Sequence, residues 1–454
     1  MPKLWAEHVL TGRGWERDVT IDIAEDGRIL SATAGTPRTG TVRPCLLPAP
    51  VNAHSHAFQR AMAGLTEARG PDARDSFWTW RRLMFAFLDR LTPEQVQAIA
   101  AFVQMEMLEA GYAAVAEFHY LHHQPGGIPY ADLSELSQRI AAAADDTGIG
   151  LTLLPVLYRF GGCDRRPLGP GQIRFGNDPD RYAALCADAA ARIARGPADW
   201  GFGTAPHSLR AVAPEDLALC LSLAGEGPVH MHLAEQVPEV EEVEAAWGLR
   251  PVEWMLAHAD PDPRWHFIHC TQMTARETAG LAQSGATAVL CPITESSLGD
   301  GIFDGTGWLA AGGALAVGSD SNIRIALSEE LRTLEYSQRL RDRSRAALAE
   351  TGVSTGRRLF GAVAAGGARA AGRGTGAIAA GEWADIIALD LAHPDLAGLT
   401  GDTILDAWVF AGDDRMVTDT WSAGRHVVQE GRHIRRAEIA TAYARAVAGL
   451  RTGL

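Results

Sequence analysis

Short apolar runs alternate with longer, alanine-rich amphipathic stretches through the central part of the chain. Eight runs have strand length and are bounded by polar or glycine-rich positions, which predicts β-strands over 47–53, 112–118, 150–157, 200–205, 229–232, 265–268, 286–290 and 314–318. Helical periodicity between them predicts helices, for example over 93–110, 133–147, 181–195, 214–223, 274–283 and 328–347. Alternating strands and helices predict a parallel α/β fold, and eight such units are what a (β/α)8 TIM barrel requires.

The two ends of the chain have a different rhythm, with a period of about two residues. Residues 19–23, 385–390 and 418–428 alternate in this way and are interrupted by turn residues such as Asp26-Gly27. We therefore expect residues 1–45 and 361–435 to form a small β-sandwich module beside a barrel over 46–360. Residues 436–454 are expected to form a C-terminal helix, and the Gly/Ala-rich residues 361–376 a linker.

Composition narrows the class of partner. The 454 residues are 47% hydrophobic and 21% charged, as in a globular enzyme, and the formal net charge is −14. An acidic chain argues against nucleic acid and anionic membranes as partners, although a local arginine cluster can still bind an anionic substrate. The absence of a Cys-x-x-Cys pair, of a signal-peptide pattern and of a long apolar run leads us to expect a cytoplasmic protein with six reduced thiols, Cys45, Cys163, Cys186, Cys220, Cys270 and Cys291.

Histidines and acidic residues gather where the predicted barrel strands end. Because strand residues i and i+2 point to the same side, His54 and His56 leave the first strand together. The carboxyl ends of all eight strands meet at one face of a barrel. The fifth, sixth and eighth strands also carry imidazoles or carboxylates near their ends, so the sequence predicts a metal-dependent site with His54, His56, His232, His269, Glu235 and Asp320 around it.

Other aromatic and histidine positions have simpler interpretations. His230 has the same parity as His232 but lies deeper in the barrel, so we interpret it as structural. His122 and His123 are adjacent and point apart in most backbones, which argues against a second metal cluster. Trp78 and Trp80 are expected to pack a loop after the first strand and not to stack on a base.

The residues His54-x-His56, His232, His269 and Asp320, in this order and at these strand ends, resemble the amidohydrolase superfamily. Residues 376–387 resemble the segment that leads into the C-terminal β module of that superfamily. Members of that superfamily with two bridged metal ions usually have a carboxylated lysine at the end of the fourth strand. No lysine stands there in this chain, so the resemblance implies one metal ion and not two. His54, His56, His232 and Asp320 are then the expected ligands of one Zn²⁺ per subunit, with Fe²⁺ or Mn²⁺ as alternatives, and the resemblance implies a homodimer.

A narrower resemblance rests on longer motifs. These motifs are residues 52–60, 77–82, 116–123, 291–301 and 328–332. Together they resemble the formimidoylglutamate deiminase family, and the similarity extends over essentially the whole chain. That family hydrolyses N-formimino-L-glutamate, a small dicarboxylate, to N-formyl-L-glutamate and ammonia. The expected catalytic groups are Asp320 as acceptor of the proton of the attacking water, Glu235 as proton carrier to the leaving nitrogen, and His269 as hydrogen-bond partner of the attacking water or tetrahedral centre.

Substrate recognition requires groups that hold carboxylates away from the reacting carbon. Arginine suits this task because its planar guanidinium can make two parallel hydrogen bonds to a carboxylate. By resemblance, the expected substrate-binding residues are Gln59, Arg81, Tyr120, His207 and Arg210, with Arg82 as the alternative to Arg81.

Two other functions remain open at this point. One is an aminohydrolase of a heterocycle such as guanine or an adenosine derivative, although the arginines argue against a pocket built to read a ring. The other is a catalytically inactive, amidohydrolase-like assembly protein. Such a protein is expected to lose metal ligands, whereas every candidate ligand is present here.

Overall fold

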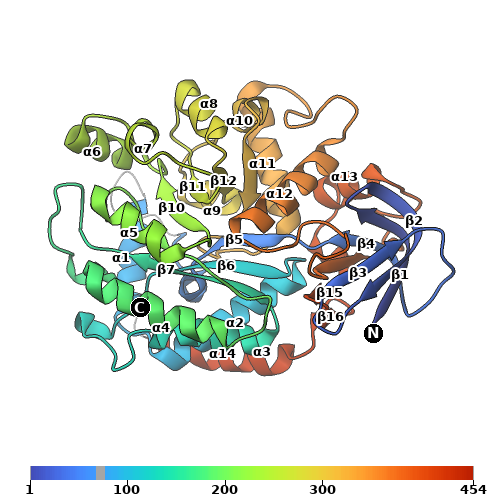
Figure 1. The fold of residues 1–454 in the computed structure, drawn as a ribbon, viewed down its shortest axis with the longest axis horizontal. Coiled ribbons are helices and arrows are strands. Elements are labelled where there is room, and N and C mark those ends of the chain that lie inside the picture. Colours follow the sequence, from blue (N-terminus) through green and yellow to red (C-terminus); the bar gives the residue numbers. More distant parts are fainter. Residues whose placement is uncertain (1, 68–76, 453–454) are drawn as a thin grey trace.

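The computed structural model describes residues 2–67 and 77–452, and its centre is a barrel of short parallel strands (Figure 1). One half of the barrel contains β5 (Val51–Ser55), β6 (Ala114–His119), β7 (Gly150–Leu157), β8 (Gly201–Phe202) and β9 (Ala205–Pro206). The other half contains β10 (Val229–Leu233), β11 (Trp265–His269), β12 (Thr287–Leu290) and β13 (Ala314–Val317). Strand β7 pairs with both β8 and β9, so these two short pieces together form the fourth of the eight strand positions.

Two seams close the halves into a barrel. At one seam Thr204 bridges Val229, and at the other Ser55 bridges Asp320. In the second seam the N–H of Asp320 donates to the carbonyl of His54 and the N–H of His56 donates to the carbonyl of Asp320, both at 2.9 Å. Gly318 allows this approach, because a Cβ there would lie 2.5 Å from the backbone nitrogen of His54.

Helices surround the barrel and pack their apolar sides on it. Several begin with a capping side chain; Thr92, for example, forms a reciprocal capping box with Gln95. In chain order they are α1 (Phe77–Leu88), α2 (Pro93–Glu109), α3 (Glu135–Thr147), α4 (Pro179–Ala194), α5 (Pro214–Ala224), α6 (Val237–Trp247), α7 (Pro251–His258), α8 (Ala275–Gln283), α9 (Pro292–Leu298), α10 (Gly305–Ala310), α11 (Leu327–Asp342) and α12 (Thr355–Ala370). Short 3-10 turns are η1 (Ala57–Met62), η2 (Pro125–Gly127) and η3 (Pro170–Phe175).

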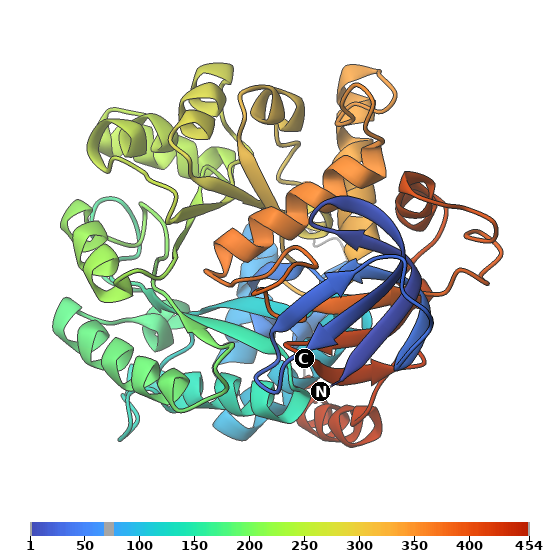
Figure 2. The same cartoon turned by 45° about the vertical axis from the view of Figure 1, so that its right-hand side comes forward.

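The two ends of the chain share one eight-stranded sheet beside the barrel (Figure 2). Its strand order is β17-β16-β15-β14-β4-β1-β2-β3, so the N- and C-terminal segments join where β4 pairs antiparallel with β14. These strands are β1 (Lys3–Thr11), β2 (Gly14–Ile23), β3 (Ile29–Thr33), β4 (Thr41–Pro48), β14 (Ile386–Leu389), β15 (Val417–Ser422), β16 (Arg425–Gln429) and β17 (Arg432–His433). The predicted barrel with a β module built from both ends is confirmed.

The remaining elements follow β14 and the last strand. Helix α13 (Asp402–Phe410) and the turn η4 (Asp414–Met416) lie between β14 and β15, and α14 (Arg436–Arg451) follows β17. Helix α14 packs on α2, where the rings of Tyr443 and Phe102 stack with centroids 3.9 Å apart. The C-terminal helix therefore packs against a helix of the barrel. The domain divisions after residues 45, 360 and 435 stay predictions.

Among the sequence predictions about local structure, those for the first strand and for the linker are wrong. The first predicted strand, 47–53, joins the end of β4 to β5, and the two strands are separated at Ala49 and Pro50. Prolines 48 and 50 explain the break, since neither can donate a ladder hydrogen bond. The predicted linker 361–376 is helical up to Ala370, because it belongs to α12.

Small residues in α12 serve close packing against the barrel. A Cβ on Gly366 would lie 1.9 Å from the carbonyl oxygen of Leu315, and one on Gly367 would lie 3.0 Å from that of Val51. Helix α12 thus lies directly on β13 and β5, the strands of the second seam. This segment is rich in glycine and alanine because the backbone of α12 lies close to the barrel strands, and not because the segment is a flexible linker.

A buried group of charges connects the barrel to the terminal sheet. Arg373 donates to Asp385 at 2.7 and 3.0 Å and to Asp199 at 2.9 Å, and Arg425 donates to both oxygens of Asp199. Burial alone would raise the pKa of Asp199, but the hydrogen bonds and charges of Arg425 and Arg373 lower it below its usual value. This carboxylate therefore stabilises the fold above about pH 4, and the contribution is lost as the pH falls through the lowered pKa.

The variant Arg373→Leu is expected to lower the free energy of unfolding by about 3–5 kcal/mol at pH 7, because it removes the arginine that pairs with buried Asp385 and leaves Asp199 with Arg425 alone. The loss should shrink as the pH falls and those carboxylates take up protons. Reversible chemical denaturation at several pH values measures both effects. As a matched control, Arg415→Leu removes an exposed ion pair with Asp413 and should change stability by no more than about 0.5 kcal/mol. Equal effects of the two variants would contradict the prediction.

Candidate metal centre and active site

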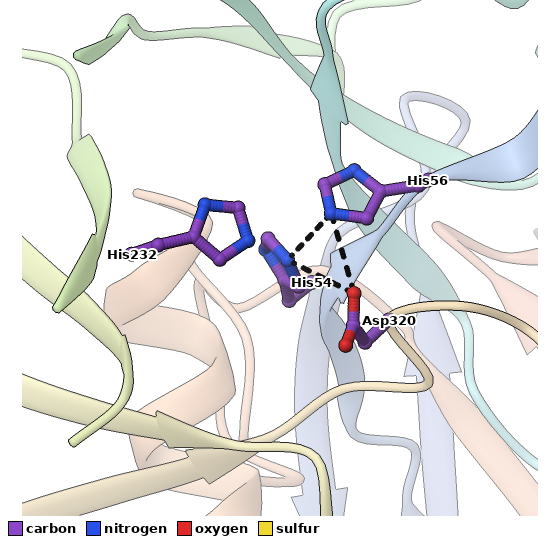
Figure 3. A group of neighbouring side chains, drawn as sticks. All are labelled: His54, His56, His232 and Asp320. Atoms are coloured by element: carbon purple, nitrogen blue, oxygen red, sulfur yellow. Dashed lines mark hydrogen bonds and ion pairs between the residues drawn. The ribbon is translucent and has the colours of Figure 1, made fainter. Parts of the chain in front are cut away.

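Four buried side chains from three barrel strands meet at the carboxyl end of the barrel (Figure 3). His54 and His56 come from β5 and the residue after it, His232 comes from β10, and Asp320 follows β13. Their potential ligand atoms all lie within 4.8 Å of one another. The Oδ1 atom of Asp320 is 3.5 Å from Nε2 of His54 and 3.2 Å from Nε2 of His56. Three imidazoles and one carboxylate in this arrangement form a metal-binding group.

The ring orientations suit a metal. Nδ1–H of His56 donates to the carbonyl of Phe118 at 3.0 Å, and that of His232 donates to the carbonyl of His207 at 3.2 Å, which leaves both Nε2 lone pairs directed to the centre. Burial is the largest cause of the lowered pKa of His54 and of His232, and neighbouring imidazoles add to it. Neutral imidazoles are the form that binds a metal. The residues present therefore fit a divalent ion.

A hydrogen-bonded network fixes the loop that carries Asp320. The side chain of Asn52 donates to Oγ of Ser319, which donates to Oδ1 of Asn322, and Asn322 in turn donates to Oγ of Ser55. Asp320 and Asn322 have φ angles of 47° and 54°, in the left-handed region that disfavours L residues. The network holds this strained backbone, and with it the carboxylate, in place.

Glu235 and His269 lie beside the metal-binding group. The carboxylate of Glu239 accepts the backbone N–H of Ala234 at 3.1 Å and of Glu235 at 2.9 Å, which fixes the start of the loop after β10. Burial raises the pKa of Glu235. Nε2 of His269 is 3.9 Å from Oε1 of Glu235 and 3.8 Å from Oδ2 of Asp320. Burial alone would lower the pKa of His269, but the charge of Glu235, the hydrogen bond to Glu295 and the charge of Asp320 raise it to about 10.

One pocket opens onto these groups and contains four of the five expected substrate-binding residues. Nε2 of Gln59 donates to the hydroxyl of Tyr120 at 2.7 Å, and His207 lies between Tyr120 and His232 with ring centroids 6.0 and 4.9 Å away. Arg210 lines the same pocket. The full lining is His56, Gln59, Met84, Tyr120, Tyr158, Phe175, His207, Arg210, His232, Glu235, His269, Leu298, Asp320 and Ser321.

The fifth expected residue, Arg81, and its alternative Arg82 have side chains outside the described residues, and so do Trp78 and Trp80. The backbone of all four belongs to helix α1, whereas a loop was expected there. The choice between Arg81 and Arg82 stays open.

The histidines that were interpreted as structural bind backbone carbonyls. Nε2 of His230 donates to Ala370 at 2.7 Å, that of His122 to Val156 at 2.9 Å, and that of His123 to Gly176 at 2.9 Å. Within the described part of the chain, none of these three belongs to a group of potential metal ligands.

Sequence reasoning missed Tyr158 and Glu295. Tyr158 directly follows β7, so the rule that located His56 and Asp320 at strand ends could have found it. Glu295 stands four residues after Cys291, in a segment singled out only for its resemblance. Glu295 lies 26 positions after His269, so no local sequence pattern predicts that the two side chains are in contact.

Among residues 2–67 and 77–452, the helices are all too short or too polar to cross a membrane.

Comparison with known proteins agrees with this geometry. The model of the amidohydrolase family matches residues 45–427. Formimidoylglutamate deiminase of Pseudomonas aeruginosa is 47% identical over 437 residues, which cover 95% of this chain and 96% of that protein. The crystal structure of an amidohydrolase from Brucella melitensis is 46% identical, with a TM-score of 0.95 over 99% of this chain and 100% of that one.

A more distant solved structure shares the fold. An adenosine deaminase from Xanthomonas campestris with bound zinc is 22% identical, with a TM-score of 0.83 over 99% of this chain and 98% of that one. The matched residues 45–427 include all four members of the metal-binding group. On these grounds the chain belongs to the amidohydrolase family.

Proposed function

We propose that this protein hydrolyses N-formimino-L-glutamate to N-formyl-L-glutamate and ammonia. One observation carries the proposal: three members of the metal-binding group (His56, His232 and Asp320) line a single pocket together with Glu235, His269 and the cationic Arg210. The likeness to formimidoylglutamate deiminase, over nearly the full length of both chains, supports the choice of substrate. A homodimer in the cytoplasm stays a prediction.

The reaction adds water across the carbon–nitrogen double bond of the formimino group. The tetrahedral carbon then carries a hydroxyl, the substituted nitrogen of glutamate and an amino group. Breaking the bond to the amino group, with a proton delivered to that nitrogen and the proton of the hydroxyl lost, forms the formyl carbonyl and releases ammonia. When bound, a divalent ion supplies a Lewis acid that lowers the pKa of water towards about 7.

Three side chains are proposed to handle protons. Asp320 accepts the proton that water loses on attack, and Glu235 carries a proton to the departing nitrogen. Burial raises the pKa of Glu235, which supports this role, because a raised pKa brings a carboxyl group closer to the range in which general acids and bases work. Nε2–H of His269 lies between these two carboxylates, where it can hydrogen-bond the attacking oxygen or the tetrahedral centre.

We propose Zn²⁺, one ion per chain, as the resident metal. His54, His56, His232 and Asp320 would hold it, since three neutral imidazoles and a carboxylate suit zinc. Fe²⁺ and Mn²⁺ are compatible with the same ligands, so metal analysis of purified protein decides among the three.

The carboxylates of the substrate are proposed to bind to polar and charged residues that line the same pocket. Arg210 and His207 supply positive charge or hydrogen-bond donors after the fourth strand position, and Gln59 and Tyr120 supply polar groups close to His56. Arg81 is proposed as a further carboxylate partner. A site of this kind selects for charge and against a neutral heterocycle.

Purified metal-loaded protein is expected to release ammonia from N-formimino-L-glutamate and to show almost no release from guanine or adenosine. Removing the metal with a chelator should abolish turnover, and added Zn²⁺ should restore it. A coupled ammonia assay measures both. Preference for a heterocycle would replace the proposal with the aminohydrolase alternative, and no turnover of any of these substrates would favour the inactive assembly protein.

Glu235→Gln is expected to lower kcat by a factor of ~10² or more, because the amide cannot carry a proton. Metal content should stay at the wild-type ratio, since Glu235 is proposed not to be a ligand. Steady-state kinetics and metal analysis test the two statements together. Glu241→Gln, on the exposed side of helix α6, is the matched control and should leave kcat within about twofold of wild type. Loss of the metal in Glu235→Gln would make Glu235 a ligand.

Arg210→Ala is expected to raise KM by a factor of ~10–100, which corresponds to one or two charge-assisted hydrogen bonds, and to change kcat much less. The reason is that the carboxylate contact is remote from the reacting carbon. Arg165→Ala removes an exposed arginine whose nearest carboxylate is Glu215, so it serves as control with an unchanged KM. If the two variants had equal KM values, the carboxylate site would have to lie elsewhere.

A further inference from the structure

Glu295 is a buried carboxylate that contacts a catalytic side chain and has no assigned role. It lies near the start of α9, just after β12, and only 6% of the residue is exposed. Its Oε1 atom accepts Nδ1–H of His269 at 3.1 Å and the backbone N–H of Cys291 at 2.8 Å. The same oxygen therefore ties the imidazole to the turn that begins α9.

The contact determines which nitrogen of His269 faces the reaction. With Nδ1–H donated to Glu295, Nε2 is left on the opposite side of the ring, where it lies 3.9 Å from Glu235 and 3.8 Å from Asp320. His269 and Cys270 have φ angles of 71° and 52°, so the ring leaves β11 from a left-handed backbone. A strained segment of this kind keeps its geometry only where neighbouring groups hold it.

A second interpretation of this cluster is less well supported. His269, Cys291 and Glu295 lie close enough together to hold a metal ion. However, Nδ1 of His269 and Oε1 of Glu295 already engage each other, and that oxygen accepts a second N–H from Cys291. Burial is the largest cause that raises the pKa of the Cys291 thiol, so this group keeps its proton and makes a poor ligand. The geometry favours a hydrogen-bonded support over a second metal site.

We propose that Glu295 is a positioning residue for the hydrolysis: it holds the imidazole of His269 so that Nε2–H points at the reacting atoms. The inference rests on the proposed function, because it assigns Glu295 a part in the same reaction. Glu295 acts through His269 and does not touch the substrate. Supporting groups of this kind contribute by keeping a functional side chain within about 0.5 Å of its productive position.

The chain provides a matched control for the effect of disturbing this turn. Glu330, on α11, is also a buried carboxylate, and its Oε2 atom accepts the backbone N–H of Ile293 at 2.9 Å. Glu295 and Glu330 thus hold the same turn, at Cys291 and at Ile293. Of the two, Glu295 is the one bonded to His269, so the variants Glu295→Leu and Glu330→Leu separate support of the turn from support of the ring.

Kinetics of the metal-loaded protein provide the first test. Glu295→Leu should lower kcat by a factor of ~10–100 with KM within about threefold of wild type, as for groups that orient functional histidines. Glu295→Gln, whose amide oxygen can still accept from Nδ1–H, should recover at least part of that loss, and Glu330→Leu should leave kcat within about threefold. In a His269→Asn background, Glu295→Leu should cost less than about threefold. Equal losses in both backgrounds, or equal losses for the two leucine variants, would overturn the proposal.

Crystal structures without substrate provide a test that does not depend on activity. In Glu295→Leu, the ring of His269 should rotate or shift by more than about 0.5 Å, whereas in Glu330→Leu it should stay in place. An unmoved ring in Glu295→Leu would overturn the positioning role. This outcome is distinct from failure of the proposed function, which would appear as lack of turnover of N-formimino-L-glutamate by the wild-type protein.

Discussion

The seam between β5 and the residues after β13 is the constraint on which the site depends. Two backbone hydrogen bonds between His54, His56 and Asp320 close the barrel there, and these three residues are also members of the metal-binding group. The contacts that close the sheet therefore also bring three of the four members of the metal-binding group together. The absence of a side chain at Gly318 permits the approach, and the network of Asn52, Ser319 and Asn322 holds it.

Around the pocket, several buried carboxylates accept hydrogen bonds from backbone N–H groups of the neighbouring loops. Glu117 accepts the N–H of Ala57 at 2.7 Å behind the His54–His56 turn, Glu239 accepts two N–H groups before Glu235, and Glu295 accepts that of Cys291. Burial raises the pKa of Glu117 to about 7, and the hydrogen bonds from Ala57 and Ser55 act in the opposite direction. Each carboxylate satisfies backbone donors of a loop that carries reactive groups. Irregular backbone can be rigid here because its polar groups have partners.

The strand-end rule explains why much of the site could be predicted. His54 lies in the short strand β5 and His56 directly follows it. Because the carboxyl ends of parallel barrel strands lie at one face, the correct fold class was sufficient to predict that these residues meet His232 and Asp320. The local pattern led to a wrong prediction where residues are small because two elements pack closely together. The glycines of α12 suggested a linker, but they allow the helix backbone to approach β13 and β5, and that neighbour is invisible in the sequence.

The sequence by itself determined the barrel, the β module built from both ends, and the residue types that gather at one face, because these follow from periodicity and from the order of strands. Only the tertiary structure decided which ring nitrogens of His56, His232 and His269 face the centre, and that Glu295 belongs to the site. Those choices depend on hydrogen bonds between residues that are distant in the chain: 62 positions separate His56 from Phe118, and 26 separate His269 from Glu295. No local pattern encodes such contacts, because they form only after the strands have closed into a barrel.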